Sequence, residues 1–202
     1  MRWVVLPSWT FVFLSAVCVS AQTPLPPGAR TLINEDRFGR QIALCADTGA
    51  PATRRGPRTV RATAVWAGER SALRRVEAGA GACDPAWSPD GRRLAVTSSE
   101  GLWVLASDAS EASLRVEARP PKGELADVAY RAFTQPRWSP DGALVALVVT
   151  NGAMSWVEVF DASSGRLFYT SPPGNDSFSW GSGGRALKLG AGAVEIRLPS
   201  YR

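Results

Sequence analysis

The residues of this sequence that could carry out chemistry are its acidic side chains, its serines and two lysines, because it contains no histidine. Without histidine, Ser-His-Asp triads and the usual zinc and haem sites are excluded. A serine nucleophile would need Lys122 or Lys188 as its base. Neither lysine lies in Ser-x-x-Lys spacing, and the sequence has no Gly-x-Ser-x-Gly elbow.

Two aspartates, Asp90 and Asp141, occupy identical Ser-Pro-Asp-Gly tetrapeptides and are the natural carboxylate pair to consider for a glycoside hydrolase. That chemistry needs carboxyl groups about 5–9.5 Å apart, and equivalent positions of separate repeats normally lie farther apart. The other acidic residues lack the Asp-x-Asp-x-Asp-Gly spacing of a calcium loop. We therefore expect no catalytic residue, no metal site and no cofactor, and predict that the protein is not an enzyme.

Positive charge is concentrated in one part of the sequence. The chain has 23 Lys and Arg against 18 Asp and Glu, a net charge of +5. Arg54, Arg55, Arg58 and Arg61 lie in the most basic segment and are the candidate binding residues. They would meet an acidic protein, anionic lipid head groups or an acidic glycan; the alternative is a solvated strand face with loop arginines. No motif indicates nucleic-acid binding.

The first 21 residues have the pattern of a secretory signal peptide. A positive start at Arg2 precedes an apolar stretch that ends in Val19-Ser20-Ala21, which fits cleavage after Ala21. The alternatives are an uncleaved anchor or lipidation of Cys18. We expect a periplasmic or secreted protein with no transmembrane span after cleavage, in which residues 22–30 form an extended lead-in.

The two remaining cysteines, Cys45 and Cys83, could form a disulfide bond in an oxidising compartment. Such a bond could contribute about 3–4 kcal/mol by restricting the unfolded chain. Two free buried thiols are the alternative, because the spacing of the cysteines does not determine the distance between them.

The most informative feature is an internal repeat. Asp84-Pro85-Ala86-Trp87-Ser88-Pro89-Asp90-Gly91 is echoed at residues 135–142, and a weaker copy follows at residues 177–184. Each copy precedes a short aliphatic run, and a second such run comes after a turn. These runs are rich in β-branched and aliphatic residues and are bounded by Gly, Asn and Ser, so they predict strands. Beyond the first 21 residues no segment has sustained helical periodicity.

The Ser-Pro-Asp-Gly tetrapeptide has the composition of a tight turn between two strands. Proline presets φ, aspartate bonds the local backbone, and glycine adopts the positive φ that closes the turn. The preceding tryptophan is suited to packing between neighbouring sheets. We therefore assign a structural role to the motif residues, which are Pro85, Trp87, Pro89, Asp90, Gly91, Pro136, Trp138, Pro140, Asp141, Gly142 and Trp180.

The pattern Pro-x-Trp-Ser-Pro-Asp-Gly followed by an aliphatic strand resembles the WD40-like Asp repeat (PD40) of TolB-like β-propellers, which are exported bacterial proteins. This resemblance implies an all-β fold in which residues 31–202 form a small propeller domain. About four blades fit the length, at approximately 38–80, 81–120, 131–173 and 174–202. The last blade shows three strands, and Thr31 to Asn34 could supply its fourth and close the ring. If closure fails, exposed edge strands would need a partner or a second copy of the chain.

The resemblance also implies a function, because such propellers mostly serve as binding platforms in the cell envelope. We expect a non-catalytic protein-interaction module whose partner is an envelope protein, and the basic segment would suit an acidic one. One alternative is a propeller that binds a small ligand or a glycan. The other is a fragment or partner of a peptidase-type enzyme, since related propellers precede such domains.

Overall fold

The computed structural model describes residues 29–55, 58–60, 62–108, 112–118, 131–190 and 194–198. The signal peptide expected at residues 1–21, Cys18, Arg61 and Lys122 lie outside these residues. Within them, every regular element is a β-strand, and no helix is long and apolar enough to cross a membrane. The all-β class expected from the repeat is confirmed.

The strands form four antiparallel sheets in chain order, together with a separate hairpin. The first sheet contains β1 (Ala29–Glu35), β2 (Gln41–Asp47), β5 (Thr63–Glu69) and β6 (Arg74–Val76). The second contains β7 (Cys83–Trp87), β8 (Arg93–Ser98), β9 (Gly101–Ala106) and β10 (Ala112–Glu117). The third contains β11 (Ala132–Trp138), β12 (Leu144–Thr150), β13 (Ser155–Asp161) and β14 (Leu167–Thr170). The fourth contains β15 (Phe178–Trp180), β16 (Ala186–Leu189) and β17 (Val194–Arg197), and the hairpin contains β3 (Thr53–Arg55) and β4 (Arg58–Val60).

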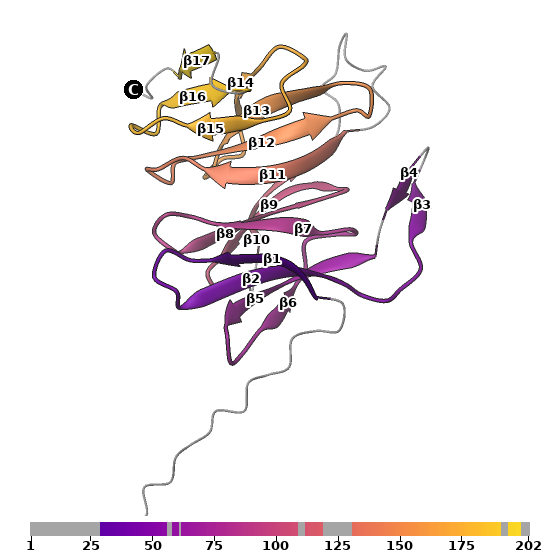
Figure 1. The fold of residues 1–202 in the computed structure, drawn as a ribbon. Coiled ribbons are helices and arrows are strands. Elements are labelled where there is room, and N and C mark those ends of the chain that lie inside the picture. The colour runs from indigo at the N-terminus through magenta and orange to yellow at the C-terminus, as the bar shows by residue number, and fades with distance from the viewer. Residues whose placement is uncertain are drawn as a thin grey trace, which may run out of the picture.

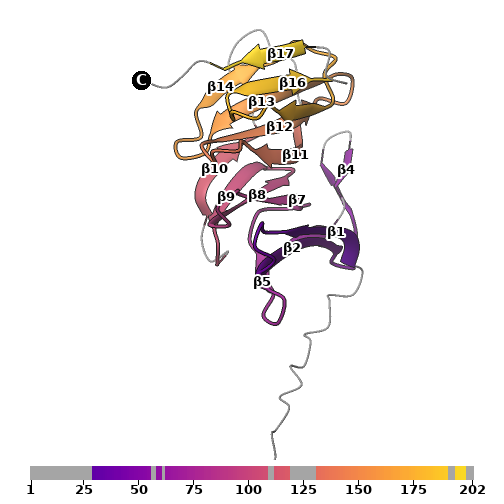
Figure 2. The same ribbon diagram turned by 60° about the vertical axis from the view of Figure 1, so that its left-hand side comes forward.

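The sheets stack in a row like successive propeller blades. Figures 1 and 2 show them in chain order, with the first sheet at one end of the row and the fourth at the other. In each sheet the first strand in sequence is a terminal strand of the sheet, and we call β1, β7, β11 and β15 the inner strands.

The expectation that Thr31 to Asn34 could complete the fourth sheet is wrong. These residues belong to β1, which pairs with β2 in the first sheet through Ile33 opposite Leu44 and Asn34 opposite Ala43. The first sheet therefore begins at Ala29 rather than near residue 38, so residues 29 and 30 of the expected lead-in belong to β1, and residues 22–28 lie outside the described part of the structure. A short connection to β2 makes this pairing local, and closing a short loop costs less entropy than reaching the far end of the chain.

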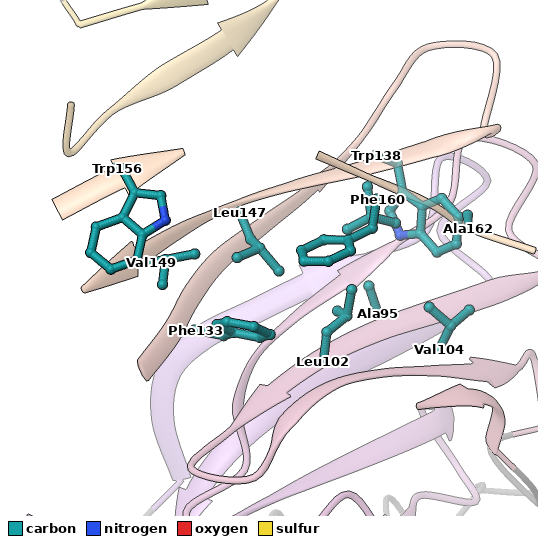
Figure 3. Packing of buried hydrophobic residues seen from close by; sticks show 11 residues of the cluster. Ala95, Leu102, Val104, Phe133, Trp138, Leu147, Val149, Trp156, Phe160 and Ala162 are labelled. Atoms are coloured by element: carbon teal, nitrogen blue, oxygen red, sulfur yellow. The ribbon is translucent and has the colours of Figure 1, made fainter. Parts of the chain in front are cut away.

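Apolar side chains fill the spaces between successive sheets. Three clusters lie between the first and second, second and third, and third and fourth sheets. Figure 3 shows the middle cluster, in which Phe133 and Phe160 of the third sheet lie near Leu102 of the second. The run Leu144–Val149 is buried throughout, because β12 has a neighbouring sheet on both faces.

The fourth sheet is apolar on one face only. Leu187 and Leu189 are buried against the third sheet, whereas Lys188 between them is exposed, as are Glu195 and Arg197 on β17. Strand alternation places these three charged residues on the face away from the third sheet. This end of the row is therefore polar.

A disulfide bond joins the first two sheets. The sulfur of Cys45 on β2 bonds that of Cys83 at the start of β7, with 5.1 Å between the Cα atoms. The bond links the first and second sheets covalently, so Cys45 and Cys83 are not free thiols in the structure.

Candidate binding groove along the inner strands

The Ser-Pro-Asp-Gly turns connect the first two strands of the second and third sheets. In the third sheet, the Ser139 hydroxyl donates to Asp141 Oδ1 at 2.6 Å and accepts from the Leu144 N–H at 2.9 Å. Asp141 Oδ1 also accepts from the Ala143 N–H at 3.0 Å. Gly142 has φ of 70°, in the left-handed region that favours glycine.

The second sheet repeats this arrangement. Ser88 donates to Asp90 Oδ1 at 2.6 Å and accepts from the Arg93 N–H at 2.9 Å. Burial opposes ionisation of Asp90, but the Ser88 hydroxyl, the Arg92 N–H and the charges of Arg93 and Arg92 outweigh it and lower the pKa of Asp90. In both sheets the serine and aspartate are occupied by holding the turn.

The first sheet contains a further copy of the turn that sequence analysis missed. Asp36 Oδ1 accepts from the N–H groups of Arg40 at 2.7 Å and Gln41 at 2.9 Å, which correspond to the two N–H groups held by the serine and the aspartate elsewhere. Gly39 has φ of 65°, and its N–H donates to the Asp36 carbonyl at 2.9 Å. The buried Asp36 carboxylate therefore makes the two hydrogen bonds that a serine and an aspartate share in the other two turns. A glycine two residues before a buried aliphatic strand was the signal that could have found this turn.

Tryptophan indoles and polar side chains connect successive inner strands. Trp138 Nε1 donates to the Ala86 carbonyl at 2.8 Å, and Trp180 Nε1 donates to the Arg137 carbonyl at 3.1 Å. Each bond runs from one sheet to the preceding one, so these tryptophans have the inter-sheet position expected from the repeat. The Trp87 indole nitrogen is buried without a hydrogen-bond partner.

Two more bonds connect these strands near their bulges. Asn34 Oδ1 accepts from the Trp87 N–H, and Asp84 Oδ2 accepts from the Gln135 N–H, both at 3.2 Å. Asp84 and Gln135 have φ of 50° and 52°, at the register shifts of β7 and β11. Such conformations cost about 1 kcal/mol or more in a residue other than glycine.

A groove of about 580 Å³ runs along β1, β7 and β11. Its polar wall includes Asn34, Asp84 and Gln135. It also includes Arg37 from the first sheet's turn and Arg137 from the third sheet. Arg137 is held in place because it lies over the Phe178 ring at 5.6 Å and donates to the Phe178 carbonyl at 3.3 Å. Glu35 forms an ion pair with Arg70. The polar residues lining the groove are Asn34, Glu35, Arg37, Asp84, Ser88, Gln135 and Arg137.

The candidate arginines identified from sequence lie elsewhere. Arg54, Arg55 and Arg58 belong to the hairpin of β3 and β4, where Arg55 is paired with Arg58, and their side chains lie outside the described part of the structure. Arg61 lies outside it altogether. Within the described residues, no group of three or more Cys, Asp or Glu side chains could hold a metal ion. Five lining residues of the groove belong to the repeat motif and were assigned a structural role from sequence: Pro85, Trp87, Pro89, Pro136 and Trp138. The polar lining residues were not identified as binding candidates, because no local motif marks them for binding.

The repeated four-stranded sheets, their inter-sheet clusters and their turns define a β-propeller module. No protein family model and no curated protein sequence matches the chain. Similar solved structures include TolB from Acinetobacter baumannii, with a TM-score of 0.53 and 16% identity over 79% of this chain and 37% of that chain. Hydrazine synthase of Kuenenia stuttgartiensis gives a TM-score of 0.56 and 14% identity over 78% of this chain and 42% of that chain.

A third similar structure is the propeller domain of the Trilobed protease from Pyrococcus furiosus, which is described as having an open velcro topology. It gives a TM-score of 0.51 and 15% identity, covering 78% of this chain and 46% of that domain. The chain therefore has a TolB-like β-propeller fold and spans less than half of the length of these three structures.

Proposed function

We propose that this chain is a non-catalytic protein-interaction module of the bacterial cell envelope, exported by its first 21 residues, that holds an extended segment of a partner protein in the groove. The signal-peptide pattern and the TolB-like fold support the location. The groove supports the mode of binding.

The observation that carries this proposal is the convergence of three terminal strands on one open groove. Because β1, β7 and β11 each lie at the edge of a sheet, one side of each strand has no neighbouring strand in its sheet. Backbone groups along such an edge can pair with an extended peptide. Side chains of neighbouring sheets already bond the N–H groups of Trp87 and Gln135 and the carbonyls of Ala86 and Arg137, so pairing uses the other backbone groups. The bulges at Asp84 and Gln135 interrupt the edges, so we expect short stretches of pairing rather than a long added strand.

Polar side chains along the same wall would give the groove its specificity. Arg137 presents a guanidinium that its contacts with Phe178 hold in place, and Asp84 presents a carboxylate from the neighbouring inner strand. The opposite charges of Arg137 and Asp84 would select the register of a bound segment, because each repels a side chain of its own sign.

Site-specific photocrosslinking in the cell envelope tests this proposal. The crosslinking amino acid would replace Glu35, which is exposed in the groove, or Glu195, which is exposed on the polar face of the fourth sheet. We expect one envelope protein to crosslink from position 35 and not from position 195. The same products from both positions, or none from position 35, would contradict the proposal.

A matched pair of charge reversals then tests whether the groove itself binds that partner. Arg137→Glu changes the groove wall, whereas Arg74→Glu changes an exposed arginine on β6. We expect the first variant to weaken binding of the purified partner about tenfold or more and the second to leave it unchanged. Equal effects of the two variants would indicate general charge attraction instead.

The basic hairpin remains a separate hypothesis for the same function. Arg54, Arg55 and Arg58 would extend the contact with an acidic partner beyond the groove. Reversing all three charges is expected to lower the association rate and its salt dependence. Unchanged binding at low and high salt would exclude a role for the hairpin.

A further inference from the structure

A second cavity, of about 500 Å³, lies where the turns of the first three sheets meet. We call it the turn pocket. It adjoins the groove, with which it shares Arg37 and Pro89. Its lining residues are Arg37, Phe38, Pro89, Asp90, Arg92, Pro140, Asp141 and Gly142.

The Phe38 side chain makes none of the hydrogen bonds that hold the first turn. It occupies the position that Asp90 and Asp141 fill in the next two turns, where an aspartate holds the backbone. In the first turn Asp36 makes those bonds. The Phe38 side chain is 51% exposed, so part of its ring is open to a ligand.

Arginines surround the exposed ring. The guanidinium carbons of Arg40 and Arg37 lie 4.8 and 5.4 Å from the centre of the Phe38 ring, and Arg92 lines the pocket from the second turn. None of these three arginines forms an ion pair with a carboxylate of the described residues. Each therefore keeps N–H donors for a ligand, while the charge of Arg92 also acts on Asp90.

The two carboxylates of the pocket are already engaged. Asp90 and Asp141 each accept through Oδ1 from a serine hydroxyl and a backbone N–H. Asp141 Oδ2 lies 3.6 Å from Arg185 Nε. They would still repel a ligand with densely spaced negative charge. The pocket therefore favours separated carboxylates together with an apolar group.

We propose that the turn pocket binds an acidic peptide segment of a partner protein that also carries an aromatic or aliphatic side chain. The carboxylates of the segment contact Arg37 and Arg92, where each guanidinium can bond a carboxylate in a bidentate manner. The apolar side chain packs on Phe38 and on the rings of Pro89 and Pro140. This inference goes beyond the proposed groove function. Because Arg37 lines both sites, Phe38 and Arg92, which line the turn pocket and not the groove, distinguish failure of one site from failure of the other.

Fluorescence anisotropy with a labelled peptide, Glu-Asp-Phe-Asp-Glu, tests the proposal on the full exported chain. We expect saturable binding that weakens as salt is added, because salt screens exposed charges. The double variant Arg37→Glu/Arg92→Glu should weaken binding about tenfold or more, and Phe38→Ala about threefold to tenfold. Neither change should alter the unfolding midpoint appreciably, because neither removes a bond that holds the turn.

Control variants and probes separate the possible outcomes. Arg74→Glu, remote from the pocket, and Arg137→Glu, in the groove, should leave binding of this peptide unchanged. Equal weakening by Arg137→Glu would move the peptide to the groove and overturn the assignment to the turn pocket. Binding unaffected by Arg37→Glu/Arg92→Glu would overturn it as well. So would equal affinity for a labelled hexathymidylate or for phosphatidylglycerol vesicles with the same arginine dependence, because the site would then bind phosphates.

Discussion

The turn of the first sheet and the turns of the second and third sheets reach the same backbone through different side chains. In the second and third sheets, a serine hydroxyl accepts from one N–H group of the turn and an aspartate carboxylate accepts from another. The pairs are Ser88 with Asp90 and Ser139 with Asp141. Asp36 takes both N–H groups on a single oxygen. The comparison shows that a repeat can lose its sequence motif and keep its geometry, and that the position released from holding the turn becomes open to another role.

The largest effect is expected for Asp36→Ala, because one change removes both side-chain hydrogen bonds of the first turn. The side chain is 4% exposed, and its loss leaves two N–H groups without their charged acceptor. We expect the free energy of unfolding to fall by about 3 kcal/mol. Urea unfolding measures this loss, and Asp36→Asn, which keeps an acceptor oxygen, serves as the control. A loss below that of Ser139→Ala would contradict the single-carboxylate arrangement.

A smaller effect is expected at the glycines of the same turns, where two of them form a matched pair. Gly91 and Gly39 have φ of 69° and 65°, so alanine is strained at both. A Cβ on Gly91 would lie 3.1 Å from Asp36 Oδ2, whereas a Cβ on Gly39 would have no neighbour within 4 Å. We expect losses of about 2 and 1 kcal/mol, respectively. Equal unfolding midpoints in urea would show that the contact with Asp36 adds no cost.

Ser139→Ala should cost less than Asp36→Ala, because Asp141 still accepts from the Ala143 N–H. The change removes the bond that the Ser139 hydroxyl accepts from Leu144 and the one that it donates to Asp141. We expect a loss of about 1 kcal/mol, because water can replace the hydroxyl at the exposed Asp141 carboxylate. The double variant with Asp141→Ala should lose less than the sum of the two single losses, since each member orients the other. Strict additivity in unfolding experiments would show that serine and aspartate act independently.

The smallest effect is the pH dependence of the two Ser–Asp turns. Hydrogen bonds and arginine charges outweigh burial and lower the pKa of Asp90 and Asp141 in the folded state. The unfolded chain therefore binds more protons, so the stabilisation is complete above the ordinary pKa of 3.8 and is lost as pH falls through the lowered values. Asp141→Asn should flatten the decline in thermal midpoint below pH 4, and an unchanged slope would contradict this assignment.

Sequence analysis identified the parts of the fold that local chemistry determines. Proline, aspartate and glycine spacing marked the turns at Ser88 and Ser139, and the aliphatic runs that follow them marked strands. It missed the turn at Asp36, because three of the four motif residues differ there: Asp36, Arg37 and Phe38 stand where the other turns have serine, proline and aspartate. It also suggested that Thr31 to Asn34 complete the fourth sheet, whereas they belong to β1 of the first sheet. Composition could not decide this, because strand pairing also depends on register and loop closure.

Sequence alone determined that this chain forms short antiparallel strands in repeated units, because alternation, β-branched residues and turn residues act over a few positions. Only the tertiary structure decided what those units build together. The groove and the turn pocket need side chains from three sheets, such as Asn34 beside Trp87 and Asp84 beside Gln135. These neighbours are far apart in the chain, and they meet only because buried apolar faces stack the sheets in a defined order.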